Sequence, residues 1–306
     1  MISAIVPTIG RVESLHALLR SLAAQTTRVD EVIVASADQR TCDFVKSANW
    51  QSEGLVVRCL VVSPPNAVRQ RMAAIDVARG DYLLILDDDV VLEPDCVQHM
   101  LPLMETSNEV VAVTADFNNH PWHNPTPIWE LYLRHILKLE REQWQGRVVG
   151  PLLRFGFNPV PQGPQPMEWL GGGNSMVRRS AYLDVGGFSD FFLHRCTMNE
   201  DVDLGLKLRR AGRILFCPLA RMAHHHAPSG RVTKFVAAED DLFNRYFILR
   251  RTLGQHFLRA FGMVTLYFSL ETLSHFLGCV KRLNFHGFVA PFGGRLRAFG
   301  RILIAR

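Results

Sequence analysis

The sequence gives no sign of export and has no framework of paired cysteines. Its first residues lack a charged segment followed by a long apolar run, so we expect no signal peptide. No CxxC pair or other spacing typical of metal ligands connects the cysteines. These absences predict free thiols in a reducing compartment, and hence a cytoplasmic protein. The six cysteines are Cys42, Cys59, Cys96, Cys196, Cys217 and Cys279.

Acidic residues are scarce toward the carboxyl end of the chain. Residues 240–306 contain ten Lys or Arg and three Asp or Glu, so this tail carries a net charge of +7 while the whole chain carries +5. The sequence has no internal repeat and no low-complexity segment. With 306 residues, of which 48% are hydrophobic, it is long and apolar enough for an α/β core with an appendage.

Short apolar runs alternate with amphipathic segments in the first ninety residues. Residues 2–6, 31–35, 55–62 and 82–86 are interpreted as buried strands, with helices between them. Strands that alternate with helices in this way form a parallel sheet with helices on both faces. We therefore expect an α/β fold that contains a mostly parallel, doubly wound sheet.

Three consecutive carboxylates, Asp87–Asp89, follow the apolar run at residues 82–86. The carboxyl ends of strands are where open α/β sheets bind ligands. Asp87 and Asp89 alternate to the same side of an extended chain, so both can face one site. Such crowding favours a hard cation, and Mg²⁺ is typically held by one or two carboxylates together with phosphates. The cluster predicts a nucleotide diphosphate site bridged by Mg²⁺ or Mn²⁺, and the alternative is a solvated acidic turn before the next helix.

Two charged residues near the ends of other predicted strands could serve the same ligand. Asp38, in the loop after the second strand, suits a hydrogen bond to a base or ribose hydroxyl. Arg69, on the helix before the aspartates, could meet a phosphate. The alternatives are a turn aspartate and a surface arginine.

A glycine triplet marks a second segment of interest. Trp169 precedes Gly171–Gly173, and Asn174 follows them before another apolar run. Glycines before a strand let the backbone approach a ligand closely or adopt positive φ, and Asn174 adds a polar contact. A β-bulge is the alternative interpretation.

Two polar clusters follow in the last third of the core. Glu200–Asp203 begins a predicted helix with three acids, more than helix capping needs, so one of them could act as a general base. In the run His224–His226, one imidazole could complete a divalent-metal site begun by carboxylates. Residues 116–168 are irregular and rich in Pro and Trp, and contain one predicted helix that Thr126 caps and that covers residues 129–143. They form either a substrate pocket or a covering layer.

Taken together, these segments resemble family 2 glycosyltransferases with the GT-A fold, over about residues 2–230. The resemblance implies a nucleotide-sugar half at residues 1–115, an acceptor half at 116–238 and a helical tail at 239–306. It also implies a nucleotide-sugar donor, a divalent cation and inversion at the anomeric carbon. The motifs that carry it are Ile5–Thr8, Asp38, Ala78–Tyr82 leading into Asp87–Asp89, Gly172–Asn174, Gly186–Phe188 and Glu200–Gly205.

The resemblance also assigns roles to single residues, each taken from a matching motif. The nucleoside is bordered by Pro7, Thr8 and Asp38, with Arg69 nearer the diphosphate. Asp87 and Asp88 reach the ribose and sugar, while Asp89 holds the metal together with His224. Asp201 is the catalytic base with Glu200 beside it, and Trp169, Gly172, Gly173 and Asn174 lie on the substrate side.

The sequence departs from the family pattern in three places. Ala35–Ala37 replaces the usual Asn-Gly-Ser, and Ala67–Gln70 replaces the usual Ala-Arg-Asn approach to the phosphates. No Gln-x-x-Arg-Trp motif and no run of transmembrane helices occur, so a processive polysaccharide synthase is not expected. A UDP- or dTDP-sugar donor and a glycan or lipid-linked acceptor are expected instead. The alternatives are a sugar nucleotidyltransferase, for which residues 7–10 supply only one glycine, and a non-catalytic nucleotide-binding scaffold at the membrane.

The basic tail contains a long apolar stretch. Between Arg259 and Lys281 the single charged residue is Glu271, and apolar residues recur at helical spacing. Because Glu271 falls in the middle, we expect an amphipathic helix on an anionic membrane surface, at the cytoplasmic face of the inner membrane, rather than a membrane span. The alternative is a lid or dimer contact. Nucleic acid is not an expected partner, because the basic residues interleave with an apolar face.

Overall fold

Two groups of chain segments build the fold in this computed structural model, which describes residues 1–122, 124–194, 197–227, 230 and 232–304. The first unit comprises Met1–Pro121 with Pro159–Gly230, and the second comprises Trp122–Asn158 with Arg231–Arg306. The functional division at residues 115 and 238 stays a prediction.

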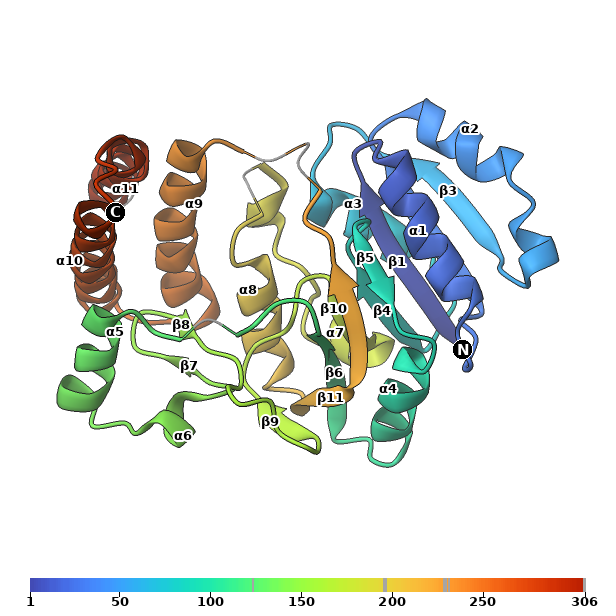
Figure 1. Ribbon diagram of the computed structural model, residues 1–306, viewed down its shortest axis with the longest axis horizontal. Helices are drawn as coiled ribbons and strands as arrows, with labels where there is room; N and C mark the ends of the chain where they lie inside the picture. Colours follow the sequence, from blue (N-terminus) through green and yellow to red (C-terminus); the bar gives the residue numbers. More distant parts are fainter. Residues whose placement is uncertain (123, 195–196, 228–229, 231, 305–306) are drawn as a thin grey trace. The chain divides into compact units, whose positions relative to one another are not determined.

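A mixed sheet is the framework of the first unit (Figure 1). Among the described residues it has nine strands, in the order β3-β2-β1-β4-β10-β6-β11-β5, with β9 paired to β11. The strands are β1 (Ile2–Thr8), β2 (Glu31–Ser36), β3 (Val57–Val61), β4 (Tyr82–Leu86), β5 (Val90–Leu92), β6 (Val110–Phe117), β9 (Gln165–Met167), β10 (Asn174–Arg178) and β11 (Arg213–His224).

The predicted parallel arrangement is confirmed for the first half of this sheet. Strands β3, β2, β1 and β4 are all parallel, as the alternation of strands and helices requires. The second half is mixed, because β10 runs antiparallel to both β4 and β6 while β11 runs parallel to β6. The insertion of β10 beside β4 places its first residue, Asn174, opposite Leu86, at the end of β4 where the aspartates begin.

Helices cover both faces of the sheet, so its central strands are apolar on both sides. On one face, alternate residues of β1 (Ile2, Ala4 and Val6) pack with residues of α1 and α4 in one hydrophobic core. The helix α3 packs on β1 and β2, and α8 on β11. The helices and short turns of this unit are α1 (Val12–Ala23), α2 (Gln39–Ser47), η1 (Trp50–Glu53), α3 (Ala67–Asp76), α4 (Cys96–Glu105), α7 (Arg179–Asp184), η3 (Asp190–His194) and α8 (Glu200–Leu208).

The prediction that all cysteines are free thiols is wrong for one pair. Cys42 on α2 and Cys59 on β3 form a disulfide with a Cα–Cα distance of 5.3 Å. Because α2 packs on β3, the fold brings together two residues whose separation of 17 in the sequence gave no sign of pairing. Cys96, Cys217 and Cys279 are free, and Cys196 lies outside the described residues. The cysteine pattern therefore does not support a reducing compartment.

The second unit is mostly helical. The single helix predicted over residues 129–143 is wrong, because α5 passes into a π-helical turn and the chain bends at Lys138, which has φ 55°. The helical tail is confirmed. Its elements are α5 (Pro127–Leu131), η2 (Tyr132–Ile136), α6 (Arg141–Trp144), the hairpin β7 (Val148–Val149) and β8 (Leu153–Arg154), α9 (Lys234–Phe247), η4 (Ile248–Thr252), α10 (Phe257–Lys281) and α11 (His286–Ile304).

A buried carboxylate ties the amino-terminal strands together. Glu31, which opens β2, accepts hydrogen bonds from Ser3 Oγ at 2.6 Å and from the Arg79 backbone N–H at 2.7 Å. It also pairs with Arg58 Nη2 of β3 at 2.6 Å. Burial alone would raise the pKa of Glu31, but these three donors outweigh burial and lower the pKa below its ordinary value of 4.5.

We expect Glu31→Gln to reduce the free energy of unfolding by about 2 kcal/mol at neutral pH, because hydrogen bonds to a charged acceptor are lost. A carboxyl group with a lowered pKa stabilises the fold above its unfolded-state pKa, and this contribution disappears as the pH falls through the folded-state value. Denaturant unfolding at several pH values should therefore show the difference in stability between the two proteins shrink as the pH falls below 4.5 and vanish below the lowered folded-state pKa. The exposed Glu105→Gln is the control, and a difference that does not change with pH would contradict the account.

Candidate functional site

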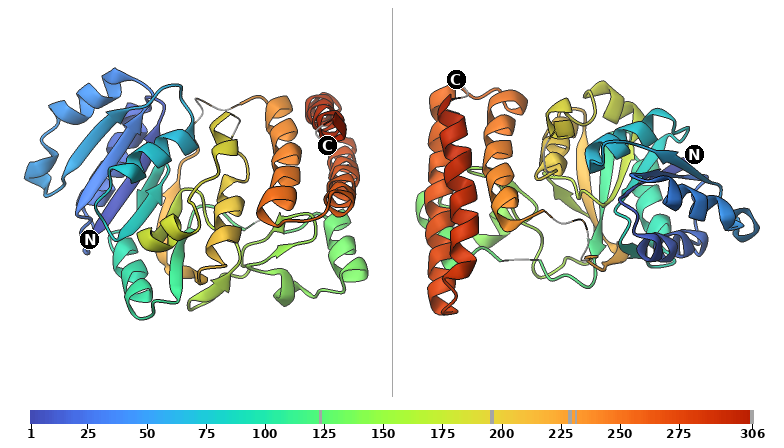
Figure 2. Two further views of the ribbon diagram at one scale, coloured as in Figure 1. Left: turned by 180° about the vertical axis from the view of Figure 1, so that it is seen from behind. Right: turned by 90° about the horizontal axis from the view of Figure 1, so that it is seen from above.

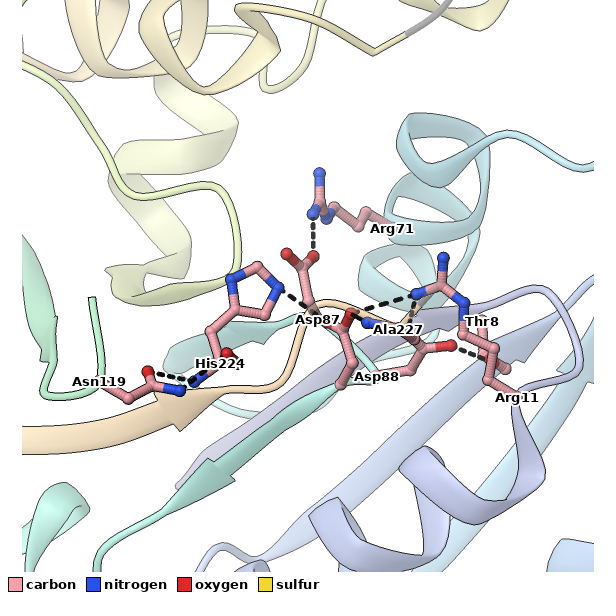
Figure 3. Close-up of polar contacts among 9 residues, drawn as sticks. Thr8, Arg11, Arg71, Asp87, Asp88, Asn119, His224 and Ala227 are labelled. Carbon is pink, nitrogen blue, oxygen red and sulfur yellow. Dashed lines mark hydrogen bonds and ion pairs between the residues drawn. The ribbon is translucent and has the colours of Figure 1, made fainter. Parts of the chain in front are cut away.

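The aspartate cluster lies where several elements of the first unit end (Figure 3). Asp87–Asp89 connect β4 to β5, and the end of β1, the helix α3 and the end of β11 all supply side chains that contact them, while the start of α8 is linked to them through Arg71. Each of the three carboxylates has a different set of partners. The three therefore differ in what they can do.

Asp88 faces the end of β1 and is almost fully buried. Thr8 Oγ1 donates to its Oδ2 at 2.5 Å, and Arg11 Nη1 lies 2.9 Å from its Oδ1. Burial raises the pKa of Asp88 to about 6; the Thr8 hydrogen bond and Arg11 oppose this rise, and the neighbouring carboxylates Asp89 and Asp87 add to it. Asp88 thus fixes the first turn after β1 against the cluster, and its contact with a ribose or sugar stays a prediction.

Asp89 is held by the last residues of β11 and the segment that follows. His224 Nε2 lies 3.0 Å from Asp89 Oδ1, and the Ala227 backbone N–H donates to Oδ2 at 2.8 Å. Burial alone would raise the pKa of Asp89, but His224, the Ala227 N–H and Arg11 outweigh it and lower the pKa to about 2. Asp89 is therefore an anion across the physiological pH range.

The imidazole of His224 is itself positioned from several sides. Asn119 exchanges two hydrogen bonds with the His224 backbone, each of 2.9 Å, and the Phe117 ring lies 5.0 Å from the imidazole. Phe117 is the last residue of β6 and Asn119 lies two positions after it, and β6 is parallel to β11. The sheet thus places the imidazole of His224 on the Asp89 carboxylate, while His225 donates its backbone N–H to the Asp89 carbonyl at 2.9 Å. The role of His224 as a metal ligand, which the resemblance implied, stays a prediction.

Arg71 joins Asp87 to the acidic start of α8. Its Nη2 lies 2.7 Å from Asp87 Oδ1 and its Nη1 lies 2.9 Å from Glu200 Oε1. The Arg71 side chain is 3% exposed, while that of Asp87 is 34% exposed, so Asp87 is the carboxylate of the cluster that is open to a ligand. Burial alone would lower the pKa of Arg71, but Asp87 and Glu200 raise it above its ordinary value. The guanidinium is therefore a permanent positive charge between two acidic motifs.

The glycine triplet separates Asp87 from Asp201. A Cβ on Gly173 would lie 2.3 Å from the Asp87 carboxylate, and one on Gly172 would lie 3.5 Å from Asp201 Oδ2. The start of α8 reaches this place because Gly205 lets the helix pack on the backbone of Trp169 and Leu170, where a Cβ would clash at 2.7 Å. The segment therefore passes close to both carboxylates, and its close approach to a ligand stays a prediction.

Other predicted site residues support the framework around the cluster. Asn174 is buried and donates to the Ala115 carbonyl at 2.5 Å. Asp38 caps α2 by accepting from the Thr41 backbone N–H at 2.9 Å. Arg69 donates to the Leu193 carbonyl at 3.3 Å. Pro7 and Trp169 are buried in the core. Ligand contacts for all five stay predictions.

Sequence reasoning missed both arginines that contact the aspartates. Arg71 lies two positions after Arg69, and in a helix this spacing places the two side chains on different faces. Arg11 directly follows Gly10, whose φ of 92° turns the chain back toward the cluster. The helical spacing of these two arginines could have shown that only one of them faces the aspartates. Arg71 faces the aspartates, and Arg69 faces the loop at Leu193.

The cluster offers ligands suited to a divalent cation. One oxygen each of Asp87 and Asp89 and one nitrogen of His224 all lie within 4.8 Å of one another. Two carboxylates and one imidazole form a donor set that suits Mn²⁺ and also Mg²⁺. His120 and His226 form a second candidate set with His224, and such a nitrogen-only set is more typical of Zn²⁺. The residues present therefore fit the predicted cation, and the structure adds Asp87 to the predicted pair.

We expect Gly173→Ala to weaken Mn²⁺ binding about tenfold or more, because a methyl group would displace the Asp87 carboxylate, and disturbing the surroundings of metal ligands typically costs 10–100-fold in affinity. Gly172→Ala is the matched control, since its Cβ would come no closer than 3.4 Å to Asp201. Titration calorimetry with Mn²⁺ would measure both variants. Equal affinities for the two variants would contradict the geometry.

Solved structures with this fold include proteins in complex with nucleotide sugars. The Pyrobaculum calidifontis mannosyltransferase PcManGT, in complex with GDP-Man and Mn²⁺, matches with a TM-score of 0.58 at 13% identity, over 98% of this chain and 86% of that one. A fragment of S. aureus TarS in complex with UDP-GlcNAc matches with a TM-score of 0.56 at 14% identity, over 98% of this chain and 82% of that one. At such low identity the likeness shows the fold alone, and the predicted GT-A fold is confirmed.

Curated relatives are similar over parts of their length. An N-acetylglucosaminyl-diphospho-decaprenol L-rhamnosyltransferase of Mycobacterium tuberculosis is 43% identical over 67 residues, which are 21% of this chain and 20% of that protein. The O-antigen biosynthesis protein RfbC of Myxococcus xanthus is 26% identical over 271 residues, 83% of this chain and 19% of that protein. The chain thus spans about a fifth of the length of these relatives.

The sequence profile described as Glycosyl transferase family 2 matches residues 3–185. This segment contains β1 to β4, the aspartate cluster and the glycine triplet, while the start of α8 and His224 lie beyond it. The chain belongs to glycosyltransferase family 2.

Proposed function

We propose that the chain is a metal-dependent, inverting glycosyltransferase that moves a sugar from a nucleotide-diphosphate donor to a hydroxyl acceptor. The observation that carries the proposal is the arrangement of Asp87, Asp89 and His224 around one ligand position, with the glycine triplet between Asp87 and Asp201. A cation site beside a carboxylate that could act as a base is what such a transfer needs. Membership of family 2 supports the same activity.

One residue, Arg71, holds two acidic groups of the site in place. Arg71 fixes the Asp87 carboxylate on one side and Glu200 on the other, so it sets the distance between the donor side and the start of α8. Burial and the neighbouring Asp201 raise the pKa of Glu200, and Arg71 opposes that rise. Glu200 therefore positions the helix start, while Asp201 beside it is the half-buried carboxylate that can meet an acceptor.

Asp201 acts as the general base in this proposal. It takes the proton of the acceptor hydroxyl, and the oxygen forms a bond to the anomeric carbon as the bond from that carbon to the diphosphate breaks. The diphosphate leaves with the electron pair of the broken bond. Displacement in a single step inverts the configuration at the anomeric carbon. Asp201 Oδ1 accepts from the Val202 backbone N–H at 2.8 Å, which orients the carboxylate.

A divalent cation, held by Asp89 and His224 with Asp87, would supply positive charge to the departing diphosphate. The lowered pKa of Asp89 keeps this ligand ionised without a cation, so the site is ready to accept one. Arg11 lies 3.4 Å from the second oxygen of Asp89 and adds positive charge on the side of β1.

The fold and the names of the relatives support a class of donor and a class of acceptor. A uridine or thymidine diphosphate sugar is the proposed donor, and a nucleotide would lie over the carboxyl ends of β1 and β2, where Pro7, Thr8 and Asp38 are found. The similarity to a rhamnosyltransferase named for a decaprenol-linked substrate and to an O-antigen biosynthesis protein supports an acceptor in cell-surface polysaccharide or glycolipid synthesis.

We expect Asp201→Asn to lower the rate of sugar transfer about 10²–10⁴-fold while donor binding changes little, because the amide keeps the shape but cannot take a proton. The rate is measured for a panel of nucleotide sugars as the amount of nucleotide released over time, with and without acceptor. Donor affinity comes from calorimetry on the same samples.

The exposed Asp184→Asn is the control for the loss of one carboxylate. Parallel loss of donor binding and transfer in Asp201→Asn would contradict the assignment of the base. Release of pyrophosphate instead of a nucleoside diphosphate would identify a sugar nucleotidyltransferase. If the unchanged protein bound a donor but never turned it over, the result would favour a non-catalytic nucleotide-binding scaffold.

A further inference from the structure

The end of α10, the turn after it and the start of α11 expose an unusual amount of apolar surface in the second unit. Figures 1 and 2 show the two helices side by side, and they are in contact. Among the described residues, α10 is the one helix long and apolar enough to cross a membrane by length and composition. Only 17% of its most apolar window is buried inside the protein, so packing in a protein core does not account for its apolar character.

Four exposed apolar residues in the last turns of α10 form a stripe. They lie at spacings of three, four and seven, which is one face of a helix. The stripe consists of Leu273, Phe276, Leu277 and Val280, each between 39% and 46% exposed. Large contiguous apolar patches on an exposed face are typical of sites that meet a protein or a membrane.

The turn between the helices continues this stripe. Leu283 is 85% exposed and has φ 51°, Phe285 is 53% exposed, and Val289 in the first turn of α11 is 66% exposed. Every residue from Val280 to His286 is exposed. We refer to residues 273–289 as the hairpin tip.

The charges at the hairpin tip are all positive. After Glu271 the sequence contains no Asp or Glu, so no acidic side chain of the tip itself can balance the exposed Lys281 and Arg282. Among the described residues, no carboxylate forms an ion pair with either of these two. Basic residues beside an exposed apolar stripe match a surface that is apolar inside and negatively charged outside.

The opposite side of α10 is occupied by the protein. Glu271, the one acid in the stretch, accepts from Trp129 Nε1 of α5 at 2.7 Å and lies 3.4 Å from Arg295 Nη2 of α11. Thr126 shares a hydrogen bond of 2.6 Å with Ser274. Because these polar contacts bind one side of α10 to α5 and α11, the helix presents its other side to a partner instead of standing alone in a bilayer.

We infer that the hairpin tip binds the surface of an anionic lipid bilayer, with Leu283 and Phe285 in the interface and Lys281 and Arg282 at the headgroups. The hairpin tip, which is both basic and apolar, matches an anionic bilayer better than it matches a second copy of itself. Two copies of the tip would place like charges opposite each other. The inference goes beyond the proposed transfer reaction and does not depend on it.

The test is co-sedimentation of the full chain with vesicles, without any nucleotide sugar. Vesicles of phosphatidylcholine with about one third phosphatidylglycerol should bind the chain more tightly than vesicles of phosphatidylcholine alone, and raised salt should weaken binding. The double variant Leu283→Glu/Phe285→Glu should lower the partition coefficient about tenfold or more. Lys281→Gln/Arg282→Gln should lower it about fivefold for each charge on anionic vesicles.

A matched control separates the hairpin tip from general surface hydrophobicity. Leu183→Glu changes a leucine of the first unit that is 54% exposed, close to the 53% of Phe285, and should leave binding unchanged. If the double glutamate variant failed to fold, the charge variant would decide alone. Equal binding of all variants, no preference for anionic vesicles, or a dimer in sedimentation velocity that the tip variants abolish without any vesicle binding would each overturn the inference.

Discussion

The buried guanidinium of Arg71 is the interaction on which the site depends. It links Asp87, at the end of a central strand, to Glu200, which begins a helix 113 residues further along the chain. A buried charge and its two carboxylate partners stabilise the fold only when all three are present. Removal of one partner typically lowers the free energy of unfolding by about 3–5 kcal/mol. This constraint fixes the separation between Asp87 and the start of α8, where the proposed base Asp201 lies, before any ligand arrives.

The sheet topology makes that link geometrically feasible. Because β10 inserts antiparallel beside β4, the glycine triplet runs directly past the end of the aspartate strand. The long strand β11 crosses to β5 and delivers His224 to Asp89. The proposed metal ligands and the proposed base therefore come from strands and helices of one unit, each held by its neighbours. Such rigid placement favours a site in which charged groups are oriented before the reaction.

Much of this could be predicted from sequence because the signals were local. The apolar runs gave the parallel strands, and the acids directly after residues 82–86 gave the cluster. The partners of those acids are set by long-range packing, which local patterns do not contain, so Arg11 and Arg71 were missed. The disulfide was missed for the same reason, since Cys42 meets Cys59 only through the packing of α2 on β3. Glu271 shows the same limit, because its partner Trp129 lies 142 positions away.

The central claim is that Asp89 and its neighbours bind a nucleotide through a divalent cation. The most direct measurement is the thermal stability of the protein with UDP, dTDP and GDP, each in Mn²⁺, in Mg²⁺ and in EDTA, for the unchanged chain and for Asp89→Asn. The account predicts that one nucleotide raises the melting temperature only when metal is present, and that Asp89→Asn removes this effect. A lack of response to every nucleotide with metal, or an equal response in EDTA, would contradict it.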